Sequence, residues 1–174
     1  MAVKKILTEP DNTLRQISKP VEQVNDEIKK LIDDMLETMY SANGIGLAAI
    51  QVGIPKRIIV MDLSKQDEKR EPRCFVNPVI KNKNIELSTY EEGCLSVPNQ
   101  FAEIERPSEC KVEYLDYNGE KKFLEAKGLL ATCIQHEMDH LEGILFIDYL
   151  SKLKKTMIIK KLSKQKGKAD RIVV

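Results

Sequence analysis

The sequence predicts an α+β fold, in which small mixed or antiparallel sheets pack around a central helix and further helices lie near the N-terminus and at the C-terminus. Three observations predict it: a long helical periodicity after residue 25, short β-branched segments and a hairpin between residues 57 and 126, and two helical segments after residue 128. The chain has 174 residues, 42% of them apolar, which is enough for one substantial core. We therefore expect a single domain over residues 1–174.

The first predicted element is a long helix that begins at Asn25 or Asp26 and ends at Gly44. Asparagine and aspartate are favoured N-cap residues, and glycine is common just after a helix. The apolar residues between these ends recur three or four positions apart, as on one buried helix face: Ile28, Leu31, Ile32, Met35, Leu36, Met39 and Tyr40. Residues 44–53 are too rich in glycine for a regular element and too apolar for an exposed loop, so we expect a buried turn.

Three strands are predicted next. Arg57–Leu63 is apolar and rich in β-branched residues, while Cys74–Ile80 and Ile85–Tyr90 are shorter candidates separated by polar turns. The segment Ser64–Arg73 between the first two is charged, so we expect a surface loop.

A hairpin and a second helix follow. Lys111–Tyr117 and Glu120–Ala126 are strand candidates joined by Asn118-Gly119, a preferred two-residue hairpin turn. Leu129–Leu141 is then expected to be helical, with Gly143 beyond its end.

The C-terminal segment Leu150–Val174 differs from the rest of the chain in charge. It holds eight Lys and one Arg against one Asp, a local balance of +8, so the first 149 residues carry −7. Ser151 is the expected N-cap of a C-terminal helix. This helix would carry four apolar residues on one face: Leu153, Met157, Ile158 and Leu162.

Composition and charge exclude several classes of protein. The 28 Lys and Arg nearly cancel 27 Asp and Glu, so the overall charge does not favour DNA as a partner. The longest apolar run, residues 44–50, is far too short to cross a membrane, and we expect no secretion signal at the N-terminus. The four cysteines lack both a Cys-x-x-Cys pair and the density of a disulfide framework. We therefore expect a cytoplasmic protein with reduced thiols and with neither a membrane nor DNA as a partner.

The chain has only two histidines, His136 and His140, and their spacing is the strongest indication of function. Residues four positions apart are neighbours on a helix, so two imidazoles can bind one divalent ion while Glu137 lies beside it. A metal-bound water has a pKa of about 7, so Glu137 can take a proton from it and later return the proton to a leaving amine. The alternative is a pair of surface or core histidines on a structural helix, although this spacing seldom arises by chance.

A catalytic centre of this kind usually has three protein ligands and an open position. Metalloproteases commonly take the third ligand from farther downstream. The carboxylates downstream here do not fit that pattern: Glu142, Asp148 and Asp170. The third ligand is therefore expected upstream.

The four cysteines are the upstream candidates. Cys133 shares a helix face with the histidines but lies seven residues, roughly 10 Å, from His140, so we expect it to line a pocket near the metal. Cys94 follows a glycine that lets the backbone bend closely, so it is the preferred ligand. Cys74 and Cys110 stay open as alternatives.

Three segments together resemble the signature motifs of the peptide deformylase family, in the same order: Gly44-Ile45-Gly46-Leu47-Ala48-Ala49-Ile50-Gln51, Glu92-Gly93-Cys94-Leu95-Ser96 and Gln135-His136-Glu137-Met138-Asp139-His140. The length, the helix before the first motif and the hairpin before the third also resemble the bacterial-type enzymes. The resemblance implies a metal on the central helix, held by Cys94, His136 and His140. The metal is usually Fe²⁺ in this family, with Zn²⁺, Ni²⁺ or Co²⁺ able to substitute. It further implies hydrolysis of the formyl group from the N-terminal formyl-methionine of new polypeptides, with release of formate.

The resemblance also implies roles for individual residues. Glu137 is the general base and then the acid, while the Gln51 side-chain amide and the Leu95 N–H donate to the developing oxyanion. The backbone of Gly46 pairs with the substrate peptide. An apolar pocket for the methionine side chain would be lined by Ile45, Leu129 and Cys133, with ordinary core packing as the alternative for the first two. Residues 97–101 contain no Arg to meet the substrate backbone, so a peptide preference beyond methionine is not implied.

Two further expectations concern charged residues. Arg106 is expected to pair with Glu92 or Asp139 and so to steady the ligand loop. In bacterial deformylases a C-terminal helix can dock on the ribosome, and the basic segment after residue 150 resembles that arrangement. A solvated helix end is the alternative.

Two other functions stay open as alternatives. A metallopeptidase is favoured by the His-Glu-x-x-His element taken alone. A ribosome- or RNA-binding module would instead carry a structural metal closed by four protein ligands, with Cys133 as the fourth, and would leave Glu137 without a task.

Overall fold

The computed structural model describes residues 2–172, with side chains described as far as residue 165. An antiparallel sheet contains five strands, in this order: β1 (Gly46–Ala48), β2 (Ile58–Met61), β3 (Arg73–Lys83), β6 (Glu109–Leu115) and β7 (Lys121–Lys127). A second sheet has two strands, β4 (Leu87–Cys94) and β5 (Val97–Pro107). The α-helices are α1 (Asp26–Ser41), α2 (Gly128–Leu141) and α3 (Lys152–Ile172). Short 3-10 helices cover Asn12–Arg15, Ala49–Val52 and Phe146–Tyr149.

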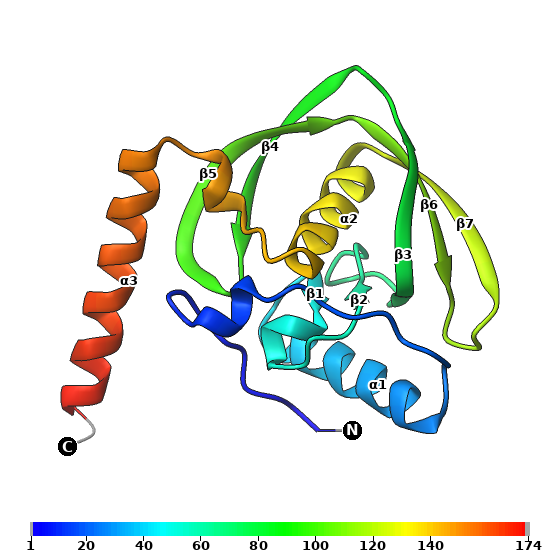
Figure 1. The fold of residues 1–174 in the computed structure, drawn as a ribbon, viewed down its shortest axis with the longest axis horizontal. Coiled ribbons are helices and arrows are strands. Elements are labelled where there is room, and N and C mark those ends of the chain that lie inside the picture. Colours follow the sequence, from blue (N-terminus) through cyan, green and yellow to red (C-terminus); the bar gives the residue numbers. More distant parts are fainter. Residues whose placement is uncertain (1, 173–174) are drawn as a thin grey trace.

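Figure 1 shows α2 between the two sheets, with α1 below it and α3 at the side. Ten of the fourteen residues of α2 are buried, including its glutamate and both of its histidines. The α+β class with sheets around a central helix is thus confirmed. Within the described part of the chain, no helix combines the length and the apolar character needed to cross a membrane.

The predicted N-terminal helix is present as α1. Asn25 is its N-cap, because its Oδ1 accepts a hydrogen bond from the Ile28 backbone N–H at 3.1 Å. The apolar face packs against residues of β1, β2 and β3. The prediction that Gly44 ends the helix is wrong by two residues. Asn43 takes the left-handed conformation, with φ of 56°, and the helix ends at Ser41.

Only the middle of the segment 44–53 is buried as predicted, over residues 47–51, and the prediction of an irregular turn is wrong. Gly46–Ala48 forms the edge strand β1, which pairs antiparallel with β2, and the 3-10 helix Ala49–Val52 follows. Leu47 and Ala48 are fully buried. Glycine and alanine do not favour strands on their own, so here tertiary packing against α1 and α2 overrides local preference.

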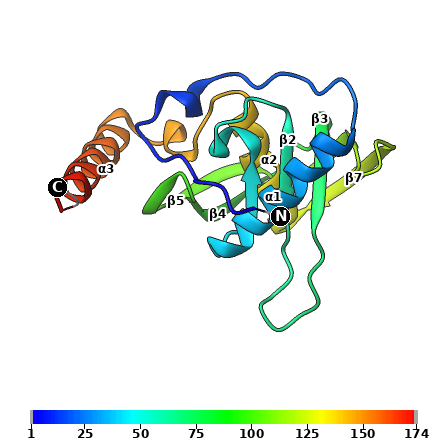
Figure 2. The ribbon, with the colours of Figure 1, turned by 90° about the horizontal axis from the view of Figure 1, so that it is seen from below.

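The predicted strands and surface loop between residues 57 and 83 are present as β2, β3 and an exposed loop, which projects from the body in Figure 2. The hairpin β6–β7 is also present, but its turn is longer than two residues. Leu115 pairs with Lys121, and the Asp116 N–H still bonds to the Glu120 carbonyl at 2.9 Å, which leaves a three-residue loop. Gly119 takes φ of 80°, as the last position of such a loop requires.

The second sheet shows the largest difference from the prediction. β4 extends four residues beyond Tyr90, as far as Cys94, and β5 was not predicted at all. Charged residues hide β5 in the sequence, because Glu103 and Glu105 lie on its exposed face while Arg106 is buried at 4% exposure. A buried arginine breaks the apolar alternation by which a half-buried strand is recognised.

The C-terminal helix α3 begins after Ser151, whose Oγ accepts a hydrogen bond from the Lys154 backbone N–H at 3.3 Å. The predicted apolar face is only partly correct. Leu162 is 4% exposed and packs in a cluster with Val97, Ile104 and Phe146, whereas Leu153 and Met157 are mainly exposed. The final two residues of the predicted basic tail, 173–174, lie outside the described residues.

Replacement of Leu162 by alanine tests whether α3 belongs to the folded body. We expect Leu162→Ala to lower the free energy of unfolding by about 2 to 4 kcal/mol, because it empties a fully packed position. Met157→Ala is the control, since the side chain is 61% exposed on the same helix. Urea titrations of the two variants measure the difference, and equal midpoints would contradict the packing of α3.

Candidate active site

The side chains of Cys94, His136 and His140 converge, with their ligand atoms all within 4.8 Å of one another. Cys94 Sγ lies 3.4 Å from His140 Nε2. Tetrahedral bonds of about 2.3 Å to sulfur and 2.1 Å to nitrogen would place two ligand atoms roughly 3.6 Å apart, so this spacing fits a single divalent ion. Among the described residues, Cys74 and Cys110 take no part in the group.

Two elements far apart in the sequence bring these ligands together. The helix α2 presents its histidines one turn apart, and β4 ends at Cys94 directly beside it. The pairing of β4 with β5 shifts register between Gly93 and Cys94. A Cβ added to Gly93 would lie 2.6 Å from the ring of Phe101, so glycine is needed for this close approach.

Charged side chains orient the first histidine. His136 Nδ1 lies 2.7 Å from Glu92 Oε1, which turns the Nε2 edge of the ring toward the other ligands. Arg106 donates to both carboxylate oxygens of Glu92, from Nε at 2.7 Å and from Nη2 at 3.0 Å. Its Nη1 donates to Asp139 Oδ2 at 2.8 Å. The sequence prediction left two partners open for Arg106, and the structure contains both.

Burial and hydrogen bonds shift the pKa values of the groups around the ligand atoms. Burial lowers the pKa of His140, and the nearby His136 lowers it further, so the His140 ring stays neutral. Burial also acts to lower the pKa of His136, but hydrogen bonds with Cys94 and Glu92 raise it well above its usual value. Burial raises the pKa of Cys133 to about 12, so this thiol is a poor ligand and a poor nucleophile.

Glu137 lies beside the ligand group. It is 5% exposed, and its Oε2 has no hydrogen-bond partner among the described residues. Burial raises the pKa of this carboxyl to about 7, with a further contribution from the charge of Glu92, while His136 opposes the change. The carboxyl can therefore exchange a proton near neutral pH. A Cβ added to Gly46 would collide with Glu137 Oε1, so the edge strand β1 can lie this close only at a glycine.

The amide of Gln51 points at the same place. Gln51 Oε1 accepts a hydrogen bond from the Ala48 backbone N–H at 2.8 Å, which directs Nε2 toward Cys94 Sγ at 3.6 Å. Nε2 also donates to Ser96 Oγ at 3.0 Å. Ser96 was not predicted as a site residue, although it closes the second motif. Leu95 lies between Cys94 and Ser96 and lines the cavity described next.

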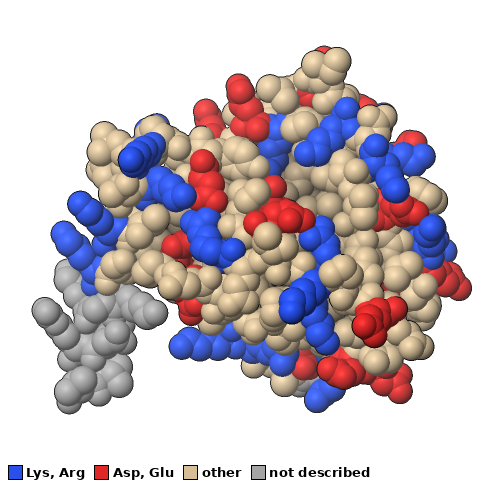
Figure 3. All heavy atoms as spheres, viewed as in Figure 1, with Lys and Arg blue, Asp and Glu red and all other residues tan. Residues whose placement is uncertain are grey.

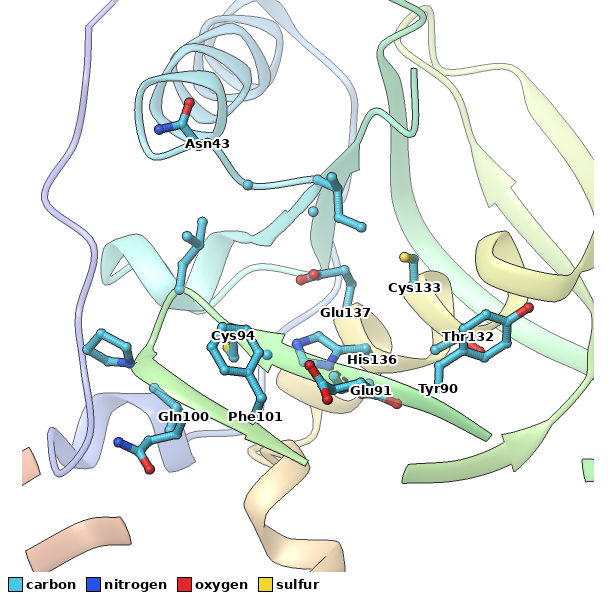
Figure 4. Close-up of a pocket in the computed structure, with 18 of the residues that line it drawn as sticks. Asn43, Tyr90, Glu91, Cys94, Gln100, Phe101, Thr132, Cys133, His136 and Glu137 are labelled. Carbon is cyan, nitrogen blue, oxygen red and sulfur yellow. Dashed lines mark hydrogen bonds and ion pairs between the residues drawn. The ribbon is translucent and has the colours of Figure 1, made fainter. Parts of the chain in front are cut away.

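A cavity of about 470 Å³ opens above these groups (Figure 4). Nine of the ten residues proposed from the sequence line it: Ile45, Gly46, Gln51, Cys94, Leu95, Leu129, Cys133, His136 and Glu137. The tenth, His140, is fully buried beneath them. In Figure 4 the side chains of Cys133, His136 and Glu137 come from the same helix and approach the cavity from one side.

Two of the apolar lining residues are exposed to the cavity rather than packed in the core. Ile45 is 46% exposed and Leu129 is 45% exposed, so the alternative of ordinary core packing is wrong for both. Phe101 also lines the cavity and is 66% exposed. It was not predicted, although an apolar side chain five residues after Ser96 in a polar segment is a usable signal.

A family model for polypeptide deformylase matches residues 3–156 of the chain. The chain belongs to the polypeptide deformylase family. Among its relatives, the peptide deformylase of Pelagibacter ubique is 75% identical over 174 residues, which is 100% of each chain. That of Maricaulis maris is 57% identical over 171 residues, which is 98% of each chain. A crystal structure of peptide deformylase from Ehrlichia chaffeensis has a TM-score of 0.92 at 45% identity, covering 97% of this chain and 99% of that one.

Membership of the family decides between the functions that the sequence left open. Peptide deformylases are metalloenzymes that remove the formyl group from the N-terminus of newly made polypeptides, and this chain is accordingly an enzyme of that class. The cysteine and two histidines form a possible metal site of the kind that a metalloenzyme requires. The metallopeptidase and the RNA-binding module with a structural metal lose their support.

Replacement of Arg106 tests the charged network behind the site. We expect Arg106→Ala to lower the free energy of unfolding by about 3 to 5 kcal/mol, because it removes the guanidinium that balances the buried charge of Glu92. Loss of that support should also speed metal release to a chelator by about tenfold or more. The control is Arg57→Ala, which removes a more exposed pair with Glu142 and should cost less than about 1 kcal/mol. Unchanged metal release in Arg106→Ala would contradict the network's role.

Proposed function

We propose that this deformylase acts through one divalent ion held by Cys94, His136 and His140, on the formyl-methionine of new polypeptides. The observation that carries the proposal is the position of Glu137 beside the three ligand side chains, with a buried carboxylate oxygen that has no hydrogen-bond partner in the described part of the chain. A divalent ion there would supply Lewis acidity, which polarises the formyl carbonyl and lowers the pKa of the attacking water. We propose Fe²⁺ from the family resemblance, while a thiolate and two imidazoles also suit Zn²⁺, Ni²⁺ and Co²⁺.

Glu137 is proposed to move the proton in both halves of the reaction. As a carboxylate it takes a proton from the water that attacks the formyl carbon. As a carboxylic acid it then returns the proton to the nitrogen while the carbon–nitrogen bond breaks, which gives formate and a free N-terminal amine. A pKa of about 7 supports both roles, because the two protonation states are then accessible near neutral pH.

The Gln51 amide and the Leu95 N–H are proposed as donors to the oxyanion that develops on the formyl oxygen. The Gln51 side chain is fixed in advance by its bonds to Ala48 and Ser96, so it needs no rearrangement during the reaction. A preorganised donor of this kind is worth about 3 to 4 kcal/mol of transition-state stabilisation.

The substrate is proposed to enter as an extended peptide along the edge strand β1. The outer edge of β1 has no strand partner among the described residues, so the backbone of Gly46 is available to pair with a peptide. The methionine side chain would occupy the apolar part of the cavity between Ile45, Leu129 and Cys133. We further propose that the chain is one catalytic domain over residues 1–174 that works in the cytoplasm.

Substitution of Glu137 tests the proposed mechanism directly. We expect Glu137→Gln, which keeps the shape of the side chain, to retain the metal and to lower kcat by about 10² to 10⁴. The assay follows formate and free peptide from a formyl-methionyl tripeptide by mass spectrometry, in protein purified without oxygen. Metal content is measured on the same samples. Turnover at the wild-type rate, or loss of the metal together with turnover, would contradict the role of Glu137.

The basic C-terminal helix is proposed to contact ribosomal RNA. Figure 3 shows Lys side chains along the described part of α3, and five of them are exposed: Lys152, Lys154, Lys160, Lys161 and Lys164. Lys155 is instead paired with Asp148 at 2.7 Å. Truncation of the helix would also remove the packing of Leu162, so substitution of the exposed lysines is the cleaner test.

We expect replacement of these five lysines by glutamine to abolish most co-sedimentation with ribosomes at low salt. Binding by the wild-type protein should fall steeply as salt rises, because phosphate contacts release counterions. Activity on the free tripeptide should not change, since α3 does not line the cavity in the described residues. Equal co-sedimentation of variant and wild type would favour the alternative of a solvated helix end.

A further inference from the structure

We propose that Tyr149 is a positioning residue for the metal ligand His136, which it reaches through Asp139, Arg106 and Glu92. The proposal rests on the proposed function, because it takes His136 as a ligand. It adds a residue that no sequence motif of the site contains and that lies at the base of the C-terminal helix.

An unbroken series of short hydrogen bonds joins Tyr149 to the histidine. The Tyr149 hydroxyl donates to Asp139 Oδ2 at 2.7 Å, and the same oxygen accepts from Arg106 Nη1 at 2.8 Å. Arg106 binds both oxygens of Glu92 through its other two nitrogens, and Glu92 Oε1 lies 2.7 Å from His136 Nδ1. The series runs from a side chain that is 51% exposed to one that is 8% exposed.

Tyr149 makes a second contact with the same network. Its ring lies 5.0 Å from the guanidinium carbon of Arg106, within the range of a cation–π interaction. The Tyr149 hydroxyl therefore binds Asp139 by a hydrogen bond, while the Tyr149 ring contacts the guanidinium of Arg106. Three of the nitrogens of Arg106 are thus directed at two carboxylates, and the ring restricts the plane in which they lie.

The position of Tyr149 argues against a role in core packing. It is the last residue of the 3-10 helix Phe146–Tyr149, and its neighbours Phe146 and Ile147 supply the buried contacts of that segment at 1% and 0% exposure. Loss of the hydroxyl would remove no core volume. It would leave Asp139 Oδ2 with Arg106 alone, on a side chain that is 20% exposed to competing water.

Asp139 lies between the two histidine ligands on α2, so the network holds the helix as well as the ring. Arg106, on β5, binds Glu92 on β4 and Asp139 on α2 at the same time. Tyr149 fixes the Asp139 end of this bridge. Without it, the guanidinium can follow Asp139 outward and loosen the carboxylate that orients His136.

The test compares Tyr149→Phe, Tyr149→Ala and the control Tyr117→Phe. Tyr117 also donates its hydroxyl to an aspartate, Asp33, at 3.1 Å, but on the far hairpin and away from the site. Each protein is loaded with Co²⁺, its visible absorption is recorded, and the rate of Co²⁺ transfer to a chelator is measured together with the melting temperature, kcat and KM.

We expect Tyr149→Phe to release Co²⁺ about three to ten times faster than wild type and to lower kcat with little change in KM, because the ligand is less well oriented. Tyr149→Ala should release the ion faster still, since the ring contact is lost as well. The absorption bands of both variants should shift, while those of Tyr117→Phe should not. A wild-type spectrum and release rate in Tyr149→Phe, or equal effects in the Tyr117 control, would overturn the proposal.

The wild-type protein separates this proposal from the proposed function. If Co²⁺-loaded wild type did not bind the ion or did not release formate, the assignment of the metal site would fail and this proposal with it. If wild type is active and Tyr149→Phe behaves like it, only the positioning role fails.

Discussion

The buried ion pair between Glu92 and Arg106 is the constraint on which the rest of the site depends. Both side chains are almost fully buried, and an isolated charge in a protein interior costs far more free energy than one in water. Burial acts to raise the pKa of Glu92, yet hydrogen bonds from His136 and Arg106 keep it lowered, so the carboxylate stays charged. The pair joins β4 to β5, and Arg106 also pairs with Asp139 on α2. The relative position of these three elements is therefore constrained, because any other arrangement would leave a buried charge unpaired.

This constraint explains how a ligand on a strand and two ligands on a helix come to share one ion. Cys94 ends β4 two residues after Glu92, so the element that orients His136 also carries the thiolate. The hydrogen-bond network around this pair contains five side chains: Glu92, Arg106, His136, Asp139 and Tyr149. Each of its hydrogen bonds is 3.0 Å or shorter. A network that is fully paired in this way is rigid, and rigidity of the outer partners is what fixes the direction of a ligand.

The sequence could predict those parts of the site that depend on local periodicity. Residues four apart on a helix are neighbours, which placed His136 and His140 together, and the capped periodic helix after Asn25 followed from the same geometry. Elements and contacts that depend on long-range pairing could not be predicted from local sequence patterns. Arg106 is charged but buried, so β5 lacked an apolar alternation, and the contact of Tyr149 with Asp139 spans two elements that no local pattern connects. The residues alone preferred Cys94 but left Cys74 and Cys110 open, and the family resemblance selected Cys94. The fold supplies the physical reason, because β4 ends at Cys94 and places it with the histidines of α2.

The open side of the cavity is built differently from the side that carries the charges. There the edge strand β1 comes so close to α2 that a Cβ at Gly46 would collide with Glu137 Oε1, and the exposed groups are backbone and apolar side chains. Hydrogen bonds to a peptide backbone do not select among peptide side chains, whereas the apolar cavity bounded by Ile45 and Leu129 selects one side chain. Under the proposed function, this division lets one enzyme act on many new polypeptides that share only their first residue. Because β1 lies so close to Glu137, a peptide paired with β1 would have its end beside the group that moves the proton. Gly46 would therefore serve both the pairing of the peptide and this approach to Glu137.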